Sequence, residues 1–320
     1  MTAPESALES APEAAVAALP DATVVIPHLN DAARLQGCLE ALAGQRLAPG
    51  QRFEVLVVDN GSREPPEALV AGFAGMRLVA EPVPGPGPAR NRGIALAAAP
   101  VVAFLDSDCI PDPGWLAAML AGFADPSCLV QGGAVEIFAA DPARPNRAEA
   151  FDLVYGIRQE WTIARHGFAA TANLAVRREV FDAVGGFEGL HISEDMEWGM
   201  RAKARGVETR FNPAAVMRHP ARAAMADLRR QWDRHISHHW SMQPKTAKGR
   251  ATWTLRAAAM ALSPVAEVPR VLGAAQLKGP RQKLAALSAV TRMRLYRARR
   301  MLAELVDPAA RLKSAHWNRT

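Results

Sequence analysis

The chain has 320 residues, of which 49% are hydrophobic, so it can bury one large core or two modest ones and is not a disordered protein. Its net charge of +6 is unevenly distributed, since residues 1–240 hold 22 Lys+Arg against 29 Asp+Glu and residues 241–320 hold 16 against 3. A basic tail behind an acidic main part indicates contact with something anionic, such as a membrane surface, with a solvated basic face as the alternative.

The cysteines and the N-terminal residues indicate the cellular compartment in which the protein is expected. Cys38, Cys109 and Cys128 are odd in number and lack metal-type spacing, so neither a disulfide framework nor a zinc site is indicated, and a cytoplasmic location is expected. Residues 1–21 lack the basic start and apolar centre of a secretion signal and are predicted to be a flexible leader. No run reaches the roughly 20 apolar residues that span a bilayer, so no transmembrane segment is predicted.

Strands and helices alternate through the first third of the chain. Strands are predicted at residues 23–26, 53–58, 76–80 and 101–105, where the sequence is β-branched or continuously apolar. Between them, helices are predicted after Asn30 or Asp31, after Pro65, and across Arg90 and Asn91. This alternation predicts a mostly parallel sheet covered by helices.

Acidic residues follow two of these strands. Asp59 and Asn60 end the second strand, and Asp106 and Asp108 end the fourth, where ligands bind in open α/β sheets. Asp106 and Asp108 repel each other at such close spacing, and Mg²⁺ or Mn²⁺ would relieve that repulsion while also binding a substrate's phosphates. The sequence therefore predicts a metal and diphosphate site, against the alternative of a simple Asp-rich turn.

Beyond Asp108 the pattern changes, and we expect this half of the chain to build a pocket for a second substrate. A helix is predicted at residues 113–123, an antiparallel strand at 129–137, a further strand at 170–176, a short helix at 179–184 and a short strand at 216–218. Ser193 is predicted to start a helix that carries Glu194 and Asp195 in its first turn, where acids complement the helix dipole. The helical spacing of Met196, Met200 and Ala204 predicts that these three residues face the core.

Six segments between about residues 22 and 240 stand in an informative order. They read V-V-I-P-H-L-N, V-L-V-V-D-N-G-S, P-A-R-N-R-G, F-L-D-S-D, N-L-A-V-R-R-E-V-F-D-A-V-G-G-F and S-E-D-M-E-W. Their order and spacing resemble the family 2 nucleotide-sugar glycosyltransferases. The resemblance implies an α/β fold of the GT-A type, a doubly wound mixed sheet with a helical C-terminal extension. Its parts would be a catalytic domain at 22–240, with a nucleotide-sugar half at about 22–112 and an acceptor half at about 113–240, and a basic helical tail at 241–320.

The resemblance also implies the reaction and the residues on the donor side. A sugar would pass from a nucleotide-diphosphate donor, with a UDP-sugar favoured, to an acceptor hydroxyl with inversion of the anomeric configuration. Asp59 would bind the base, and Asn60 stands where a second Asp is common. The implied donor-binding set is Pro27, Asn30, Asp59, Asn60, Arg90, Asn91 and Asp106.

The metal ligands and the general base follow from the same resemblance. Asp108 would be the principal ligand of Mn²⁺ or Mg²⁺, and Asp106 would touch the ribose or reach the metal through water. His219 occupies the place of a histidine near the metal in related enzymes, although a core or solvent-facing histidine fits equally well. Asp195 would remove the proton from the acceptor hydroxyl as general base, and Glu194 would share or tune that role.

The end of the resembling region and the tail bear on the acceptor. Residues 231–235, Q-W-D-R-H, resemble the Q-x-x-R-W of polymerising members, with His235 in place of Trp. Without predicted membrane spans we expect single-residue transfer in glycan or glycolipid assembly, to a glycan, lipid-linked or small-molecule acceptor. The last long helix would either bind an anionic membrane, as a peripheral protein at its inner face, or pack on the catalytic domain.

Three other functions fit the sequence less well. A nucleotidyltransferase usually has a Gly-rich loop with a lysine after the first strand, which residues 24–28 lack. A non-catalytic nucleotide-sugar-binding protein would be expected to lose an acid among Asp59, Asp106, Asp108 and Asp195, and all four are present. Nucleic acid is not an expected partner, because the basic tail lacks an aromatic or recognition-helix pattern.

Overall fold

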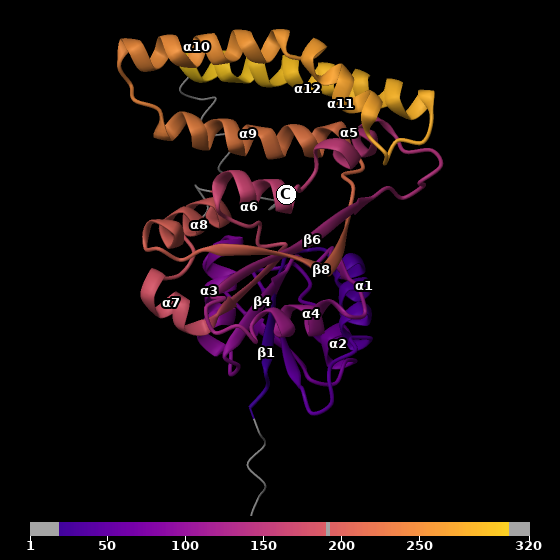
Figure 1. Cartoon of the computed structure of the whole chain (residues 1–320), viewed down its shortest axis with the longest axis vertical. Coiled ribbons are helices and arrows are strands. Elements are labelled where there is room, and N and C mark those ends of the chain that lie inside the picture. Colours follow the sequence, from indigo (N-terminus) through magenta and orange to yellow (C-terminus); the bar gives the residue numbers. More distant parts are fainter. Residues whose placement is uncertain (1–18, 190–192, 307–320) are drawn as a thin grey trace, which may run out of the picture.

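The computed structural model describes residues 19–189 and 193–306, and in these ranges it contains one eight-stranded mixed sheet and a group of C-terminal helices at one end of the molecule (Figure 1). The strand order is β3-β2-β1-β4-β7-β6-β8-β5. The strands are β1 (Ala22–His28), β2 (Phe53–Asp59), β3 (Met76–Ala80), β4 (Val101–Leu105), β5 (Ile110–Pro111), β6 (Val130–Phe138), β7 (Asn173–Arg177) and β8 (Thr209–Pro220).

Helices cover both faces of this sheet and form the far end of the molecule (Figure 1). Those of the sheet region are α1 (Ala32–Ala43), α2 (Glu67–Ala71), α3 (Pro86–Leu96), α4 (Trp115–Gly122), α5 (Arg147–Tyr155), α6 (Gln159–His166), α7 (Arg178–Val184) and α8 (Glu194–Ala204). Those of the far end are α9 (Met225–Met242), α10 (Ala247–Leu262), α11 (Val268–Gly273) and α12 (Pro280–Val306), with a 3₁₀ turn at Val265–Glu267.

The first four strands run parallel, as the βαβ alternation predicts. Successive side chains of β1 point to opposite faces, so Val24 packs with α1, α2 and α4 while Val25 packs with α3, α7 and α8. Strand β4 lies between both helical layers, and all five of its residues are buried. The predicted doubly wound α/β fold with a helical C-terminal region is confirmed.

The second half of the sheet mixes strand directions. Strand β7 runs antiparallel to both β4 and β6, whereas β6 and β8 are parallel to each other with a register shift at Gly133 and Ala134. The antiparallel direction predicted for residues 129–137 is thus correct on the β7 side. Strand β8 is much longer than the short strand predicted at residues 216–218, because pairing with β6 extends it from Thr209 to Pro220.

The face of α8 that packs against the core differs from the prediction. Trp198 and Ala202 are buried, while Met200 is 48% exposed and Ala204 is exposed, so the predicted Met196, Met200 and Ala204 face is wrong. The Trp198 ring packs against both Phe181 and Phe187, and its Nε1 donates to the Gly185 carbonyl at 2.9 Å. A buried indole removes more apolar surface from water than a methionine does, which decides the orientation of the helix.

Helix α3 approaches β1 closely because Gly93 has no side chain. A Cβ at this position would lie 2.3 Å from Cγ1 of Val25, well inside contact distance. This approach fixes the helix beside the carboxyl ends of β1 and β4. It also holds Arg90, one turn earlier, within hydrogen-bonding distance of Asp106, which follows β4.

The group of long helices, here called the helical unit, consists of α9, α10, α11 and α12. Helix α9 lies between the sheet region and the layer formed by α10 and α12 (Figure 1), and it shares a buried cluster with them that includes Ile236, Trp240, Trp253 and Met301. Helix α9 thus crosses the boundary predicted at residue 240, and through Leu228 it also packs with Phe151 of α5. Within the two described ranges, no helix combines the length and the hydrophobicity needed to cross a bilayer.

Candidate active site

The candidate site lies where the carboxyl ends of β1, β2 and β4 meet the first turn of α8 and the end of β8. Parallel strands end at one edge of the sheet, so Asp59 of β2 and the acids after β4 come to the same side. Helix α8 contributes Glu194 and Asp195, and β8 contributes His219. Residues from both halves of the chain therefore surround one edge.

Asp59 is a buried acid with one oxygen committed to the protein and one free. Its Oδ2 accepts from the backbone nitrogens of Gly61 at 3.2 Å and Ser62 at 3.1 Å, while its Oδ1 is buried and has no partner among the described residues. The neighbouring His28 imidazole is also buried, and burial lowers its pKa although Asp59 opposes that effect. A buried acceptor without a donor is costly unless a ligand supplies one.

Asn60 and Asn30 hold the loops around this acid. The Asn60 amide donates to the carbonyls of Glu81 and Val83, at 2.9 and 2.7 Å, and accepts from Gly85 N at 2.6 Å. Asn30, at a φ of 54°, accepts from the backbone nitrogen of Arg63 at 2.9 Å. The side chain of Asn60 is thus occupied with the loop that leads into α3.

Pro27, also predicted for the donor side, is half-buried near the end of β1 opposite Val58. It belongs to the same edge as Asp59, which pairs with the next residue of β1, His28. Pro27 and Asn30 thus flank the buried His28 where β1 passes into its loop.

Arg90 connects the two halves of the site. Its guanidinium is 3% exposed and donates to Asp106 Oδ1 and to Glu194 Oε1, each at 2.7 Å. Burial would lower the pKa of Arg90, but the two carboxylates outweigh it and raise that pKa, so the charge is kept. Asn91 faces elsewhere, since its amide exchanges two hydrogen bonds of 2.8 Å with the backbone of Phe187.

Asp108, Cys109 and His219 bring their ligand atoms within 4.8 Å of one another. His219 Nε2 lies 3.6 Å from Asp108 Oδ1, and its Nδ1 lies 2.8 Å from the Pro220 carbonyl, which favours the tautomer whose Nε2 lone pair faces Asp108. A carboxylate and an imidazole form a donor set that suits Mn²⁺. Burial, only partly offset by His219, raises the pKa of Asp108, and a cation at this place would oppose that shift.

Two details of this cluster were not predicted. Asp106 points to Arg90, so it stands apart from the Asp108 group. Cys109 joins the group, although its only sequence signal was its position directly after Asp108. Burial raises the pKa of its thiol well above the usual value, so Cys109 stays protonated and is a poor ligand for a hard cation.

Glu194 and Asp195 are neighbours in different environments. Glu194 is paired with Arg90, whereas Asp195 is half-buried and, among the described residues, accepts only from the backbone nitrogen of Met196, at 2.7 Å. Burial, followed by the charge of Glu194, raises the pKa of Asp195 to about 7. The pair thus offers one fixed anion and one carboxyl that can exchange a proton near neutral pH.

Comparison with known proteins relates the chain to glycosyltransferases. The family model for glycosyl transferase family 2 matches residues 23–185. The glycosyltransferase AglE of Haloferax volcanii is 32% identical over 216 residues, 66% of this chain and 70% of that protein. A pre-mycofactocin glycosyltransferase of Mycobacterium tuberculosis is 32% identical over 213 residues, 64% of this chain and 44% of that protein, so this chain spans less than half of it.

A solved structure agrees at the level of the fold. The mannosyltransferase PcManGT from Pyrobaculum calidifontis, determined with GDP-Man and Mn²⁺, superposes with a TM-score of 0.54 and 21% identity over 92% of this chain and 79% of that one. The matched family segment contains Asp59, Arg90, Asp106 and Asp108 and covers half of the chain. On these grounds the chain belongs to glycosyl transferase family 2.

Proposed function

We propose that the protein transfers one sugar from a nucleoside-diphosphate donor to an acceptor hydroxyl with inversion at the anomeric carbon. The observation that carries this proposal is the pairing of buried Arg90 with both Asp106 and Glu194. The pairing brings a strand-end acid of the donor half next to the acids of the acceptor half. Donor and acceptor would then meet at one point, as a direct displacement requires.

The free oxygen of Asp59 supports binding of the nucleoside at the β2 end. Its buried Oδ1 would accept a ring N–H of the base, and a UDP-sugar is favoured as donor. The two backbone nitrogens on Oδ2 fix the orientation of the carboxylate. Asn60 and Asn30 would act indirectly, by holding the loops beside the base.

Asp108 and His219 would hold Mn²⁺ or Mg²⁺, with Asp106 oriented by Arg90 toward the same diphosphate. When bound, the ion would neutralise negative charge on the departing diphosphate. Arg90 supplies positive charge at a fixed place and prevents Asp106 from turning away. The hydrogen bond of His219 Nδ1 to the Pro220 carbonyl holds the imidazole with Nε2 facing Asp108.

Asp195 would act as the general base. The acceptor oxygen attacks the anomeric carbon on the face opposite the diphosphate, the bond from that carbon to the diphosphate oxygen breaks, and the hydroxyl proton passes to Asp195. A pKa of about 7 leaves about half of this carboxyl ionised at neutral pH, ready to accept that proton. Glu194 stays bound to Arg90, and its negative charge increases the basicity of Asp195.

We also infer that the helical unit brings the protein to anionic membranes. On α10, Leu255 and Leu262 are 71% and 78% exposed and lie seven residues apart on one face, opposite buried Trp253. The excess of Lys and Arg in residues 241–320 would add electrostatic attraction to anionic lipids. Exposed leucines beside basic residues fit a peripheral, interfacial location.

The test of the transferase proposal measures release of nucleoside diphosphate from a panel of donors with Mn²⁺. Asp108→Asn removes a charged ligand atom and should lower turnover at least about 100-fold. Asp112→Asn is the matched control, because Asp112 lies four residues further along, after β5, and its carboxylate pairs with Arg218 outside the Asp108 group. Full turnover in excess chelator, or equal effects of the two variants, would contradict the proposal.

A further inference from the structure

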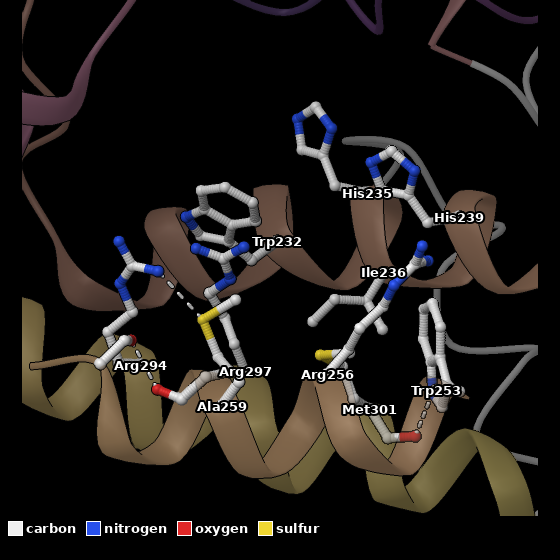
Figure 2. Close-up of a pocket in the computed structure, with 12 residues that line it drawn as sticks. Trp232, His235, Ile236, His239, Trp253, Arg256, Ala259, Arg294, Arg297 and Met301 are labelled. Atoms are coloured by element: carbon white, nitrogen blue, oxygen red, sulfur yellow. Dashed lines mark hydrogen bonds between the residues drawn. The ribbon is translucent and has the colours of Figure 1, made fainter. Parts of the chain in front are cut away.

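The helical unit contains a cavity of about 450 Å³ between α9, α10 and α12 (Figure 2). None of the residues that line it belongs to the site described above. Apart from Ser263, its lining side chains are of two kinds. The apolar ones are Trp232, Ile236, Trp253, Ala259, Met260 and Met301, and the basic ones are His235, His239, Arg256, Arg294 and Arg297.

The positive charge of the lining comes from its three arginines, because burial lowers the pKa of His235 to about 3 and also lowers the pKa of His239. Among the described residues, acidic groups compensate little of this charge. Glu267 binds Arg294, but it also accepts from the Tyr155 hydroxyl at 2.8 Å and pairs with Arg270. Arg256 donates to a neutral acceptor, Gln243 Oε1, at 3.3 Å. The lining itself contains no carboxylate, so the cavity carries excess positive charge.

Two buried donors of the lining have no acceptor within the described ranges. They are Nε of Arg297 and Nε1 of Trp232, and the two side chains stack with the guanidinium 3.4 Å from the ring centroid. Burial, followed by the charge of Arg294, lowers the pKa of Arg297 to about 9. Buried donors and an uncompensated cation are both relieved by a bound anion.

We propose that this cavity binds an amphiphilic anion, namely a phosphate group carried on a hydrocarbon chain. The phosphate oxygens would take the free N–H groups of Arg297 and Trp232, since guanidinium groups match phosphate geometry. The hydrocarbon would lie on the apolar side formed by Ile236, Trp253 and Met301. The volume is within the range of small-molecule sites, and the location is separate from the donor site. This inference goes beyond the proposed transferase function and does not depend on it.

Calorimetric titration of the full chain with three probes tests the proposal. The probes are n-decyl phosphate below its micelle concentration, n-decanol, and inorganic phosphate, which separate the contributions of chain and charge. We expect decyl phosphate to saturate one site per chain and to bind at least about tenfold more tightly than either other probe. Equal affinity for decanol would show that the phosphate charge is not recognised. Equal affinity for inorganic phosphate would show that the hydrocarbon is not recognised. Either result overturns the proposal.

Two pairs of variants locate the binding. Arg297→Gln should weaken decyl phosphate binding at least about tenfold, whereas Arg292→Gln, an exposed residue of α12 outside the cavity, should change it less than about twofold. Ala259→Phe fills the cavity and should abolish binding, whereas Ala258→Phe on the outer surface of α10 should not.

Circular dichroism verifies the fold of each variant, and if Arg297→Gln does not fold, the Ala259 and Ala258 pair decides. Unchanged binding in Ala259→Phe, or equal losses within a pair, would overturn the assignment. Donor affinity should be the same in all four variants, which separates failure of this site from failure of the transferase proposal.

Discussion

Replacing Asp195 by Asn separates a general base from an acid that merely starts a helix. The amide has nearly the same shape as the carboxyl, and its oxygen can still accept from the backbone nitrogen of Met196. It cannot take a proton from an acceptor hydroxyl. General-base catalysis contributes about 10²–10⁴-fold, so turnover per folded molecule should fall by that factor while donor affinity stays within a few-fold.

The pKa of Asp195 sets the expected pH dependence. Because only the ionised carboxyl is a base, a pKa of about 7 means that about half of the protein is competent at pH 7 and about one-tenth at pH 6. Wild-type turnover should therefore fall about fivefold between pH 7 and pH 6. The Asp195→Asn variant should lose this dependence, since its amide does not titrate.

The change in stability caused by Asp195→Asn at pH 8 also distinguishes a general base with a raised pKa from an acid that only stabilises the start of the helix. The raised folded-state pKa means that the Asp195 carboxylate is destabilising at pH 8, and that this cost declines as pH falls from about 7 toward the unfolded-state pKa of about 4. The Asp195→Asn variant should then melt at pH 8 no lower than wild type. A purely structural helix-start acid would instead lose about 0.3–1 kcal/mol on neutralisation.

Single-turnover kinetics between pH 5.5 and 8.5, with donor calorimetry and thermal melts on the same samples, measure all three quantities. Glu197→Gln is the control, since Glu197 lies in the same first turn but binds Arg201. Near-wild-type turnover in Asp195→Asn, or an unchanged pH profile, would refute the assignment.

Three further changes have defined outcomes. Arg90→Lys keeps the charge but replaces the two terminal nitrogens, which bond Glu194 and Asp106 separately, with one nitrogen on a shorter side chain, so turnover should fall about 10–100-fold, and an unchanged rate would remove the bridge from the mechanism. Gly93→Ala should lower the free energy of unfolding by about 1–3 kcal/mol in chemical denaturation because its Cβ meets Val25, and no loss would mean that α3 can shift. Leu255→Ser combined with Leu262→Ser should reduce flotation with anionic liposomes and spare donor turnover, whereas equal flotation on neutral and anionic lipids would contradict the membrane inference.

The parallel part of the sheet was predictable because its strands are continuous apolar runs that end in Asp, Asn and Gly. Helix α5 was also predictable in principle, since Asn146 and Glu149 form a capping box at its start. The face of α8 was not, because helical spacing alone does not show that one buried indole outweighs two methionines. Strand β8 was underestimated because its pairing with β6, and not its own composition, makes it a strand.

Within the site, the sequence indicated which residue types matter but not how they pair. Arg90 and Glu194 are 104 residues apart, and only the packing of α3 and α8 on one side of the sheet brings them to 2.7 Å. Asn60 and Asn91 stand in the expected motifs, yet both amides bind backbone groups of neighbouring loops. Such long-range partners leave no periodic signal in the chain.

The most direct test of the central claim is calorimetric titration with UDP-, GDP- and dTDP-sugars in the presence and absence of Mn²⁺. We predict that one donor binds in a cation-dependent manner and that Asp59→Asn weakens it by about 10–100-fold, the effect of losing a charged hydrogen bond. Glu67→Gln, an exposed acid of α2, should leave the affinity unchanged. Absence of binding for every donor would contradict a donor site at this edge of the sheet. So would a donor affinity that stays the same in excess chelator, or that stays the same in the Asp59→Asn variant.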